Sequence, residues 1–288
     1  MIVPRYWARV TSEERTPAGR RVPFSCCQWS ERSLAEAQAR AREVAERIAR
    51  RIRGGEALPE RYAYGTRPLR EEVLRELRGG DDALAAVLTR NAYGAVVLNA
   101  AGTMFVDVDL AEPSLRERLS TWFRGRGAAA PAAGSVPQAA ALATLERFVG
   151  SRAGWGFRVY RTRAGLRYLA THATFDPASD ESATAMAALG CDPRYVQLCR
   201  SQTSFRARLT PKPWRCGTRP PPARWPFEGA AEEARARQWE AKYDAACAKF
   251  ATCALLSTVG NQWVHHDVQP IVRLHDELSR AESGLPLA

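Results

Sequence analysis

The alternation of short strands and helices between residues 95 and 215 constrains the fold of this chain more than any other feature. The stretch contains an apolar strand ending in FVDVDL, a helix in QAAALATLERFVGS, a hairpin in GFRVYRTRAGLRYLATHATF, a helix in DPASDESATAMAALG and a strand in TSFRARL. Alternating apolar residues indicate the strands, and the helical spacing of apolar residues indicates the helices. We therefore expect an α+β protein with a central antiparallel sheet.

The order of these elements, βαββαβ, is that of the ferredoxin-like and RNA-recognition-motif (RRM) folds. It predicts that the FVDVDL strand and the SFRARL strand lie beside or near each other in one sheet. The segment AVLTRNAYGAVVLNAAGTMFVDVDL, residues 86–110, is interpreted as two strands around the turn NAAGT. The RRM-like core should span residues 81–219, with a helix starting at residues 113–123 and a flexible Ala/Gly/Pro-rich insertion at about residues 124–140.

Two further segments are expected around this core. Residues 1–80 should form a hairpin and a long amphipathic helix that ends at Gly54–Gly55, followed by a short helix in PLREEVLREL. Residues 220–288 should form a helical segment that packs on the core. A long helix is expected there from AAEEARARQW through CALLSTVG, and a last one in DVQPIVRLHDELSRAES.

The composition indicates a folded protein and excludes several classes. The 288 residues are 45% hydrophobic, contain eight tryptophans and include no apolar run of about 18 residues, so no membrane helix is expected. The start, MIVPRYWARV, lacks the apolar region of a secretory signal, and we expect a cytoplasmic protein. Seven cysteines without a CxxC pair predict reduced, mostly buried thiols. The P-loop motif and the GxSxG motif are both missing from the sequence.

Positive charge is concentrated in one part of the chain. The net charge is +11, and residues 150–219 hold twelve Arg or Lys against four acids, which is a net charge of +8. Most of these cations are arginine, which suits bidentate contacts with phosphate. The excess predicts a nucleic-acid or nucleotide partner. Use of arginine for ordinary solvated positions, as in a GC-rich genome, is the alternative explanation.

Asp107 and Asp109 are the candidate catalytic and metal-binding residues. Residues i and i+2 of a strand point to the same side, so both carboxylates share one face at the end of an apolar strand. Mg²⁺ takes one or two carboxylates together with substrate phosphates, and such a site can activate an attacking oxygen. The alternatives are that both acids are solvated or that they pair with nearby arginines.

Two basic segments supply candidate binding residues. Alternating donors on a hairpin suit a phosphate, and basic residues interleaved with aromatic ones suit a nucleic-acid strand. An exposed basic face and a Trp214 anchored in the core are the structural alternatives. The expected nucleotide- and phosphate-binding residues are Arg161, Thr162, Arg163, Gly165, Arg167 and His172, and the expected nucleic-acid-binding residues are Arg206, Arg208, Lys212, Trp214 and Arg215.

The four histidines do not show a metal-ligand spacing. His265, His266 and Asp267 form the stretch HHD, and His275 with Asp276 lies further along the chain. A His–hydrophobe–His pair is missing, and polar surface residues are the expected role for histidines at a helix start.

The acidic pair Asp107 and Asp109 and the basic hairpin that follows make the chain resemble the archaeo-eukaryotic primase superfamily, which includes the primase-polymerases. The catalytic core of that family looks like a modified RRM, with an acidic pair on a strand, a small-x-His motif on a later hairpin and a third acid on a following strand. FVDVDL is similar to the acidic pair, and VYRTRAGLRYL to the Arg-Thr-x-x-Gly stretch before the histidine. Arg167 occupies the position where that histidine would be expected, and the small-x-His motif fits the stretch ATH, which ends at His172. The stretch TSFRARLTPK, where the third acid would be expected, contains no aspartate. The resemblance covers residues 95–215.

The resemblance implies a nucleotidyltransferase that binds DNA or RNA and a nucleoside triphosphate. Asp107 and Asp109 would then hold Mg²⁺ or Mn²⁺, and Arg161, Arg167 and His172 would hold the triphosphate. A non-catalytic nucleic-acid-binding accessory protein of a plasmid, phage, other mobile element or replication system is the main alternative. A metal-dependent nuclease that uses the same two acids is another. The chain also looks like a family of uncharacterised bacterial proteins, which implies no particular function.

Overall fold

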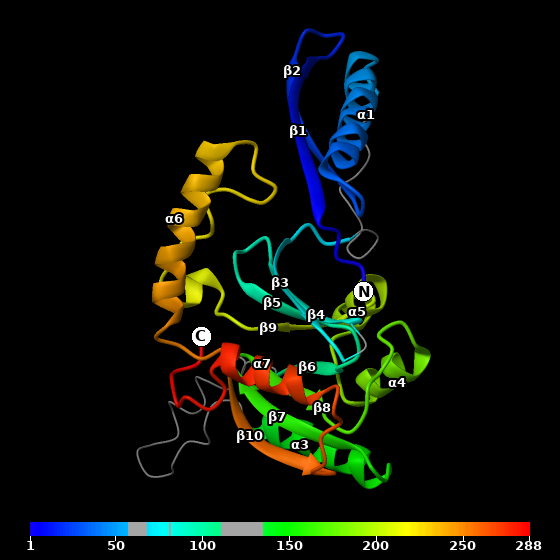
Figure 1. The fold of residues 1–288 in the computed structure, drawn as a ribbon, viewed down its shortest axis with the longest axis vertical. Coiled ribbons are helices and arrows are strands. Elements are labelled where there is room, and N and C mark those ends of the chain that lie inside the picture. Colours follow the sequence, from blue (N-terminus) through cyan, green and yellow to red (C-terminus); the bar gives the residue numbers. More distant parts are fainter. Residues whose placement is uncertain (57–67, 81, 111–134) are drawn as a thin grey trace, which may run out of the picture.

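The computed structural model describes residues 1–56, 68–80, 82–110 and 135–288 (Figure 1). These residues form two four-stranded antiparallel sheets, a separate two-stranded hairpin, and helices packed around them. The α+β class with flanking helices is thereby confirmed. No helix of these ranges is both long enough and apolar enough to span a membrane.

The N-terminal hairpin and the first helix form an arm that projects from the rest of the molecule (Figure 1). The hairpin pairs residue by residue from Tyr6↔Ser30 to Arg15↔Arg21. The helix begins after Ser33, whose side chain accepts the N–H of Glu36, and alanines along one side of it are buried. The predicted hairpin and long helix are confirmed. The arm consists of β1 (Tyr6–Arg15), β2 (Arg21–Ser30) and α1 (Leu34–Arg53).

The first four-stranded sheet has the order β3-β4-β5-β9. The helix predicted in PLREEVLREL is wrong, because this segment pairs with β4 as a strand and the pairing outweighs its helix propensity. The turn NAYG was missed: Asn91 accepts the N–H groups of Tyr93 and Ala95, so that three strands, not two, occupy residues 84–110. The strands are β3 (Glu72–Arg78), β4 (Leu84–Arg90), β5 (Val96–Ala100) and β9 (Phe205–Arg208).

The second sheet has the order β10-β7-β8-β6. The predicted hairpin GFRVYRTRAGLRYL is confirmed as β7 and β8. The helix expected to run through CALLSTVG is wrong in its second half, since that stretch pairs with β7 at the edge of this sheet. The strands are β6 (Phe105–Asp109), β7 (Gly156–Thr162), β8 (Gly165–Ala170) and β10 (Cys253–Gly260).

One helix covers each face of the second sheet. Phe148 of α3 (Ser135–Gly150) packs against Phe157 of β7. His275 of α7 (Gln269–Ser279) lies against Tyr160 of β7 and Phe105 of β6 on the opposite face. We call these the α3 face and the α7 face. Asp107 alternates with Val106 and Val108 along β6, so it shares the α7 face with Phe105.

The βαββαβ order is present along the chain, but it does not form one sheet. The strand β9 is bonded to β5 and belongs to the first sheet, so the expectation of a single sheet that holds both β6 and β9 is wrong. The backbone carbonyl of Arg208 in β9 accepts a hydrogen bond from the side chain of Arg167 in β8. A side chain, in place of a strand ladder, therefore connects β9 to the second sheet.

The remaining elements complete a core that both sheets share. The helix of DPASDESATAMAALG is confirmed, as is the last helix of the chain, α7. Residues 113–123 and most of the predicted insertion lie outside the described residues, and residues 135–140 belong to α3. The remaining elements are α4 (Asp180–Ala188), α5 (Pro193–Gln202), the single 3₁₀ turn η1 (Pro213–Arg215) and α6 (Ala230–Cys247).

Candidate functional site

Asp107 is bound by a buried arginine. Asp107 of β6 and Arg167 of β8 are direct cross-strand partners on the α7 face. The Nε–H and Nη2–H groups of Arg167 donate to the two carboxylate oxygens of Asp107 at 2.7 and 3.0 Å. Burial opposes the charge of Arg167, whose side chain is 3% exposed, but the Asp107 carboxylate outweighs burial and raises the pKa of the guanidinium. Of the alternatives considered for Asp107, pairing with a nearby arginine is therefore the one that the structure shows.

The Arg167 guanidinium continues into a buried polar network. Its Nη1–H donates to the carbonyl of Arg208 at 3.1 Å and faces Nε2 of His275 at 3.5 Å. Since a guanidinium can only donate, His275 presents a lone pair at Nε2 and carries its proton on Nδ1. That Nδ1–H donates to Asp276 at 2.9 Å. Burial lowers the pKa of His275, so the neutral ring is the stable form.

Asp276 anchors the far end of this network. It accepts the Tyr160 hydroxyl at 2.7 Å and the Arg158 guanidinium at 2.6 Å. Burial opposes its charge, but the hydrogen bonds from His275 and Tyr160 lower the pKa of the Asp276 carboxyl. Arg158 belongs to the basic hairpin but was not among the expected phosphate-binding residues, and Asp276 was not expected in a site. They belong to β7 and α7, and no sequence motif signals that these elements meet.

A thiol also lies beside His275, but it does not form a nucleophilic site. The Sγ atom of Cys253 is 3.9 Å from Nε2 of His275, which gives a Cys–His–Asp series with Asp276. Cys253 and His275 are both fully buried, and burial raises the pKa of the thiol. A substrate cannot reach this sulfur, and we interpret the series as a packed core contact.

The residues around Asp107 do not fit a divalent-metal site. Both oxygens of Asp107 already accept from Arg167, whereas a metal would need at least one of them. Among the described residues, no set of three His, Cys, Asp or Glu ligands includes Asp107 or Asp109. Asp109 is exposed at the end of β6. The Mg²⁺ or Mn²⁺ site thus stays a prediction without support from this geometry.

The residues expected to hold a triphosphate are divided between the two faces of the sheet. Arg161 pairs with Leu166 across the hairpin, whereas Arg167 pairs with Tyr160, so the two arginines point to opposite faces. His172 packs with Trp155 and Phe157 on the α3 face, and burial lowers the pKa of its imidazole. The expectation that Arg161, Arg167 and His172 converge on one phosphate chain is wrong for this reason.

The hairpin turn uses two further predicted residues for its own structure. The hydroxyl of Thr162 accepts the N–H of Gly165 at 3.0 Å. A Cβ atom on Gly165 would lie 2.1 Å from the carbonyl oxygen of Val108, so the glycine is required by the close approach of β6. Arg163 is exposed at the tip of the turn. Of these three residues, only Arg163 is available for a ligand.

Arg206 is committed to the first sheet. Its Nη2 donates to both oxygens of Glu71, at 2.9 and 3.0 Å, and its Nη1 donates to Asn99. Glu71 also accepts the hydroxyl of Thr89, and both acidic and basic side chains are largely buried. Arg206 and Arg208 share a face of β9 as predicted, but the network shows that Arg206 stabilises the sheet.

Arg208 lies in a group of cations that repel one another. Its Nη1 is buried and has no hydrogen-bond partner among the described residues. Burial and the charges of Arg167 and Arg215 lower the pKa of Arg208 to about 10. Burial and Arg208 likewise lower the pKa of Lys212, and burial and Arg163 lower that of Arg215. Asp107 offsets part of this repulsion at Arg208, and Asp109 part of it at Lys212. The remaining excess of positive charge is typical of a site that takes an anion.

An exposed aromatic pair adjoins these cations. Trp214 is 52% exposed, and its ring meets the equally exposed Tyr93 edge to face at 5.6 Å. The ammonium group of Lys212 lies 5.6 Å from the Trp214 ring. Trp214 is therefore not a core anchor. Tyr93, in the NAYG turn of the first sheet, was not predicted to belong to a site.

Comparisons with known proteins identify no relative. No protein-family model matches the chain, and searches of curated proteins and of solved structures found no significant match. The resemblance to the archaeo-eukaryotic primases thus stays a prediction that depends on residues 95–215.

Proposed function

We propose that the chain is a non-catalytic protein that binds single-stranded nucleic acid. The binding surface consists of Arg208, its two neighbouring cations and the adjoining aromatic pair. We call it the cationic–aromatic surface, and its members are Tyr93, Arg208, Lys212, Trp214 and Arg215.

The observation that carries this proposal is the charge of Arg208, whose buried Nη1 has no hydrogen-bond partner among the described residues and whose guanidinium lies beside other cations. Holding a buried positive charge next to Arg167 and Arg215 costs free energy, which the lowered pKa of about 10 expresses. Arg208 as a whole is only partly buried, and a phosphate at its accessible edge would place negative charge beside the guanidinium and relieve the repulsion between the cations. Lys212 and Arg215, which follow on the proline-rich segment after β9, would contact neighbouring phosphates of the same strand.

The aromatic pair favours a single strand over a duplex. Bases can stack on an exposed ring only when they are unpaired, and stacking tolerates any base sequence. Trp214 offers such a ring within reach of the ammonium group of Lys212. The combination supports binding of DNA or RNA through its backbone and bases, without a preferred sequence.

The contacts of Asp107 are the reason for preferring a binding protein to an enzyme. Its two oxygens are bound by Arg167, and the carboxylate cannot serve a metal while that pair persists. Nucleotidyltransferase and nuclease activity remain predictions from the sequence. We also propose a cytoplasmic location, because a protein that binds nucleic acid would find its partner in that compartment.

Fluorescence anisotropy with a labelled single-stranded oligonucleotide tests the proposal. Lys212→Ala and Arg215→Ala should each weaken binding and reduce the steepness of its salt dependence by roughly one phosphate contact. Lys242→Ala is the matched control, because it removes an exposed lysine on α6 outside the cationic–aromatic surface. Equal affinities for all three variants and the wild type would contradict the proposed surface.

A further inference from the structure

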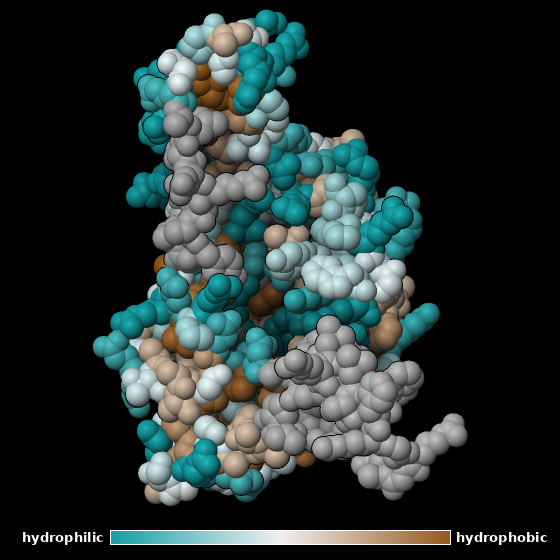
Figure 2. Space-filling model, turned by 180° about the vertical axis from the view of Figure 1, so that it is seen from behind, coloured by the Kyte–Doolittle hydropathy of each residue, from teal (hydrophilic) through white to brown (hydrophobic). Residues whose placement is uncertain are grey.

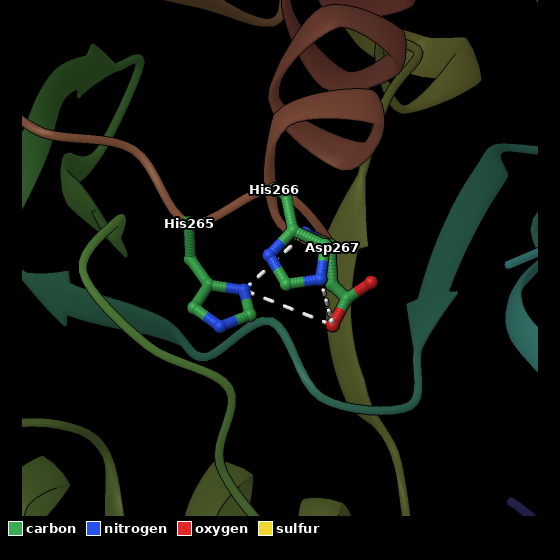
Figure 3. A group of neighbouring side chains, drawn as sticks. All are labelled: His265, His266 and Asp267. Atoms are coloured by element: carbon green, nitrogen blue, oxygen red, sulfur yellow. Dashed lines mark hydrogen bonds and ion pairs between the residues drawn. The ribbon is translucent and has the colours of Figure 1, made fainter. Parts of the chain in front are cut away.

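We propose that His265, His266 and Asp267 form a binding site for a divalent transition-metal ion, with Zn²⁺ as the representative ion. The three side chains come from the connection between β10 and α7 and point toward one another (Figure 3). Their ligand atoms all lie within 4.8 Å of one another. This site is separate from Asp107 and does not depend on the proposed nucleic-acid surface.

The distances in the group are close to those of a tetrahedral site. Oδ2 of Asp267 lies 3.7 Å from Nδ1 of His265 and 3.5 Å from Nε2 of His266. Bonds of 2.0–2.2 Å to a tetrahedral zinc ion place two ligand atoms about 3.4 Å apart. A shift of a few tenths of an ångström brings each of these two nitrogens to the required distance from Oδ2. The two nitrogens lie within 4.8 Å of each other and approach one ion by side-chain rotation.

The local hydrogen bonds already prepare one of the ligands. The backbone N–H of Asp267 donates to Nδ1 of His265 at 3.3 Å, so that Nδ1 carries a lone pair and faces the group. This hydrogen bond is long, and its loss to a metal bond would cost little. The lone pair of a neutral imidazole is the form that binds a metal.

The backbone of this turn is held in place on both sides. The N–H of His265 donates to the carbonyl of Thr171 at 2.8 Å, which fixes the turn to the end of β8. The carbonyl of His265 accepts the N–H groups of Val268 and Gln269 at 3.0 Å, and Val268 is fully buried. The backbone of the turn is thus anchored through His265, and rotation of the side chains is the movement that brings the ligands together.

The ligand types select the class of metal. Two imidazole nitrogens and one carboxylate suit zinc and its transition-metal neighbours, whereas Mg²⁺ and Ca²⁺ prefer oxygen ligands. The side chains of His266 and Asp267 are 81% and 55% exposed, so water can occupy the remaining coordination position. A bound ion would restrain the connection that leads into α7, the helix that carries His275 of the buried network.

Zinc titration of the untagged protein, with a chromophoric chelator as competitor, is the primary experiment. The proposal predicts binding of one equivalent of Zn²⁺ and a loss of affinity of about tenfold or more in each of the variants His266→Ala and Asp267→Ala. Both side chains are exposed, so the variants will fold. Asp180→Asn, which changes a carboxylate that is 88% exposed, should bind like the wild type.

Cobalt absorption distinguishes this site from zinc bound by thiols. Co²⁺ bound to nitrogen and oxygen gives visible bands without the strong thiolate charge-transfer band in the near ultraviolet. The variant Cys26→Ser/Cys27→Ser removes the two half-buried thiols and should leave binding unchanged. The proposal is overturned if the wild type binds no zinc, if His266→Ala and Asp267→Ala bind as the wild type does, or if the cobalt spectrum shows thiolate ligation.

Discussion

Arg167 and Asp107 face each other directly across β8 and β6, and the guanidinium holds both oxygens of the carboxylate. This pair explains why an aspartate occurs in an apolar strand. The cation that neutralises Asp107 is a side chain of the next strand, which also donates to the carbonyl of Arg208 in the other sheet. The buried arginine therefore adds a polar connection between two sheets that already share a hydrophobic core.

Removing the charge of Asp107 should destabilise the fold. The variant Asp107→Asn leaves the buried Arg167 without a counterion, and we expect the free energy of unfolding to fall by about 2–4 kcal/mol, allowing for the partial exposure of Asp107. Asp109→Asn is the matched control, because Asp109 is exposed and should change stability by less than about 0.5 kcal/mol. Urea unfolding measures both; equal effects would show that the pair is not the stabilising contact.

Replacing Arg208 should have opposite effects on stability and on binding. Arg208→Met keeps the length of the side chain but removes a charge that burial, Arg167 and Arg215 disfavour. We expect the free energy of unfolding to rise by about 1–2 kcal/mol, while affinity for single-stranded nucleic acid falls. Thermal unfolding and anisotropy on the same preparation check the two effects. A variant that is less stable and binds normally would refute the proposed role.

Trp214 should contribute to affinity without contributing to the salt dependence. The variant Trp214→Ala removes an exposed ring, and loss of base stacking should cost about 1–3 kcal/mol of binding free energy. The slope of log affinity against log salt should stay as in the wild type, because no phosphate contact is lost. A change in this slope, or an unchanged affinity, would argue against a stacking platform.

Acidification should weaken the fold through His275. Burial and the charge of Arg167 lower the pKa of His275 below its ordinary value of 6.5. When the pH falls through 6.5 and below, the unfolded chain therefore binds more protons than the folded chain. Stability is therefore fully present above this pH and declines below it. Burial also lowers the pKa of His172, which adds a decline of the same sign.

Unfolding free energies measured between about pH 8 and about pH 5 test this dependence. The variant His275→Gln does not titrate, so it should show a shallower decline than the wild type and retain the share due to His172. Asp276, whose pKa is lowered by its hydrogen bonds, loses its contribution only at still lower pH. A decline of the same size in the wild type and in His275→Gln would exclude His275 as its source.

The parts of the fold that depend on local signals could be predicted from the sequence. The capping serine Ser33, the glycines after α1 and the alternation in β7 and β8 are encoded within a few residues of the elements they define. Strand β10 was missed because pairing with the distant strand β7 outweighs its local preference. Strand β3 was missed because pairing with the next strand, β4, outweighs its helix propensity. Pairing between strands that are far apart in the chain also explains why β9 joins β5.

The candidate site shows a similar division. The exposure of Trp214 and the positive charge around Arg208 agree with the basic, aromatic pattern of their segment. The division of Arg161 and Arg167 between two faces follows from the hairpin register, since a turn at residues 163–164 places Arg161 opposite Leu166. An arginine partner for Asp107 was one of the alternatives, but neither Arg167 nor Glu71, the partner of Arg206, could be identified, because the tertiary fold brings them together.

The salt dependence of single-strand binding by the wild-type protein tests the central claim most directly. Each phosphate contact on a single strand contributes a slope of about −0.7 to log affinity against log salt, so the three cations Arg208, Lys212 and Arg215 predict a slope of about −2 or steeper. Anisotropy titrations over a series of salt concentrations give this slope. A slope near zero, or no binding at low salt, would contradict a phosphate-binding role for the cationic–aromatic surface.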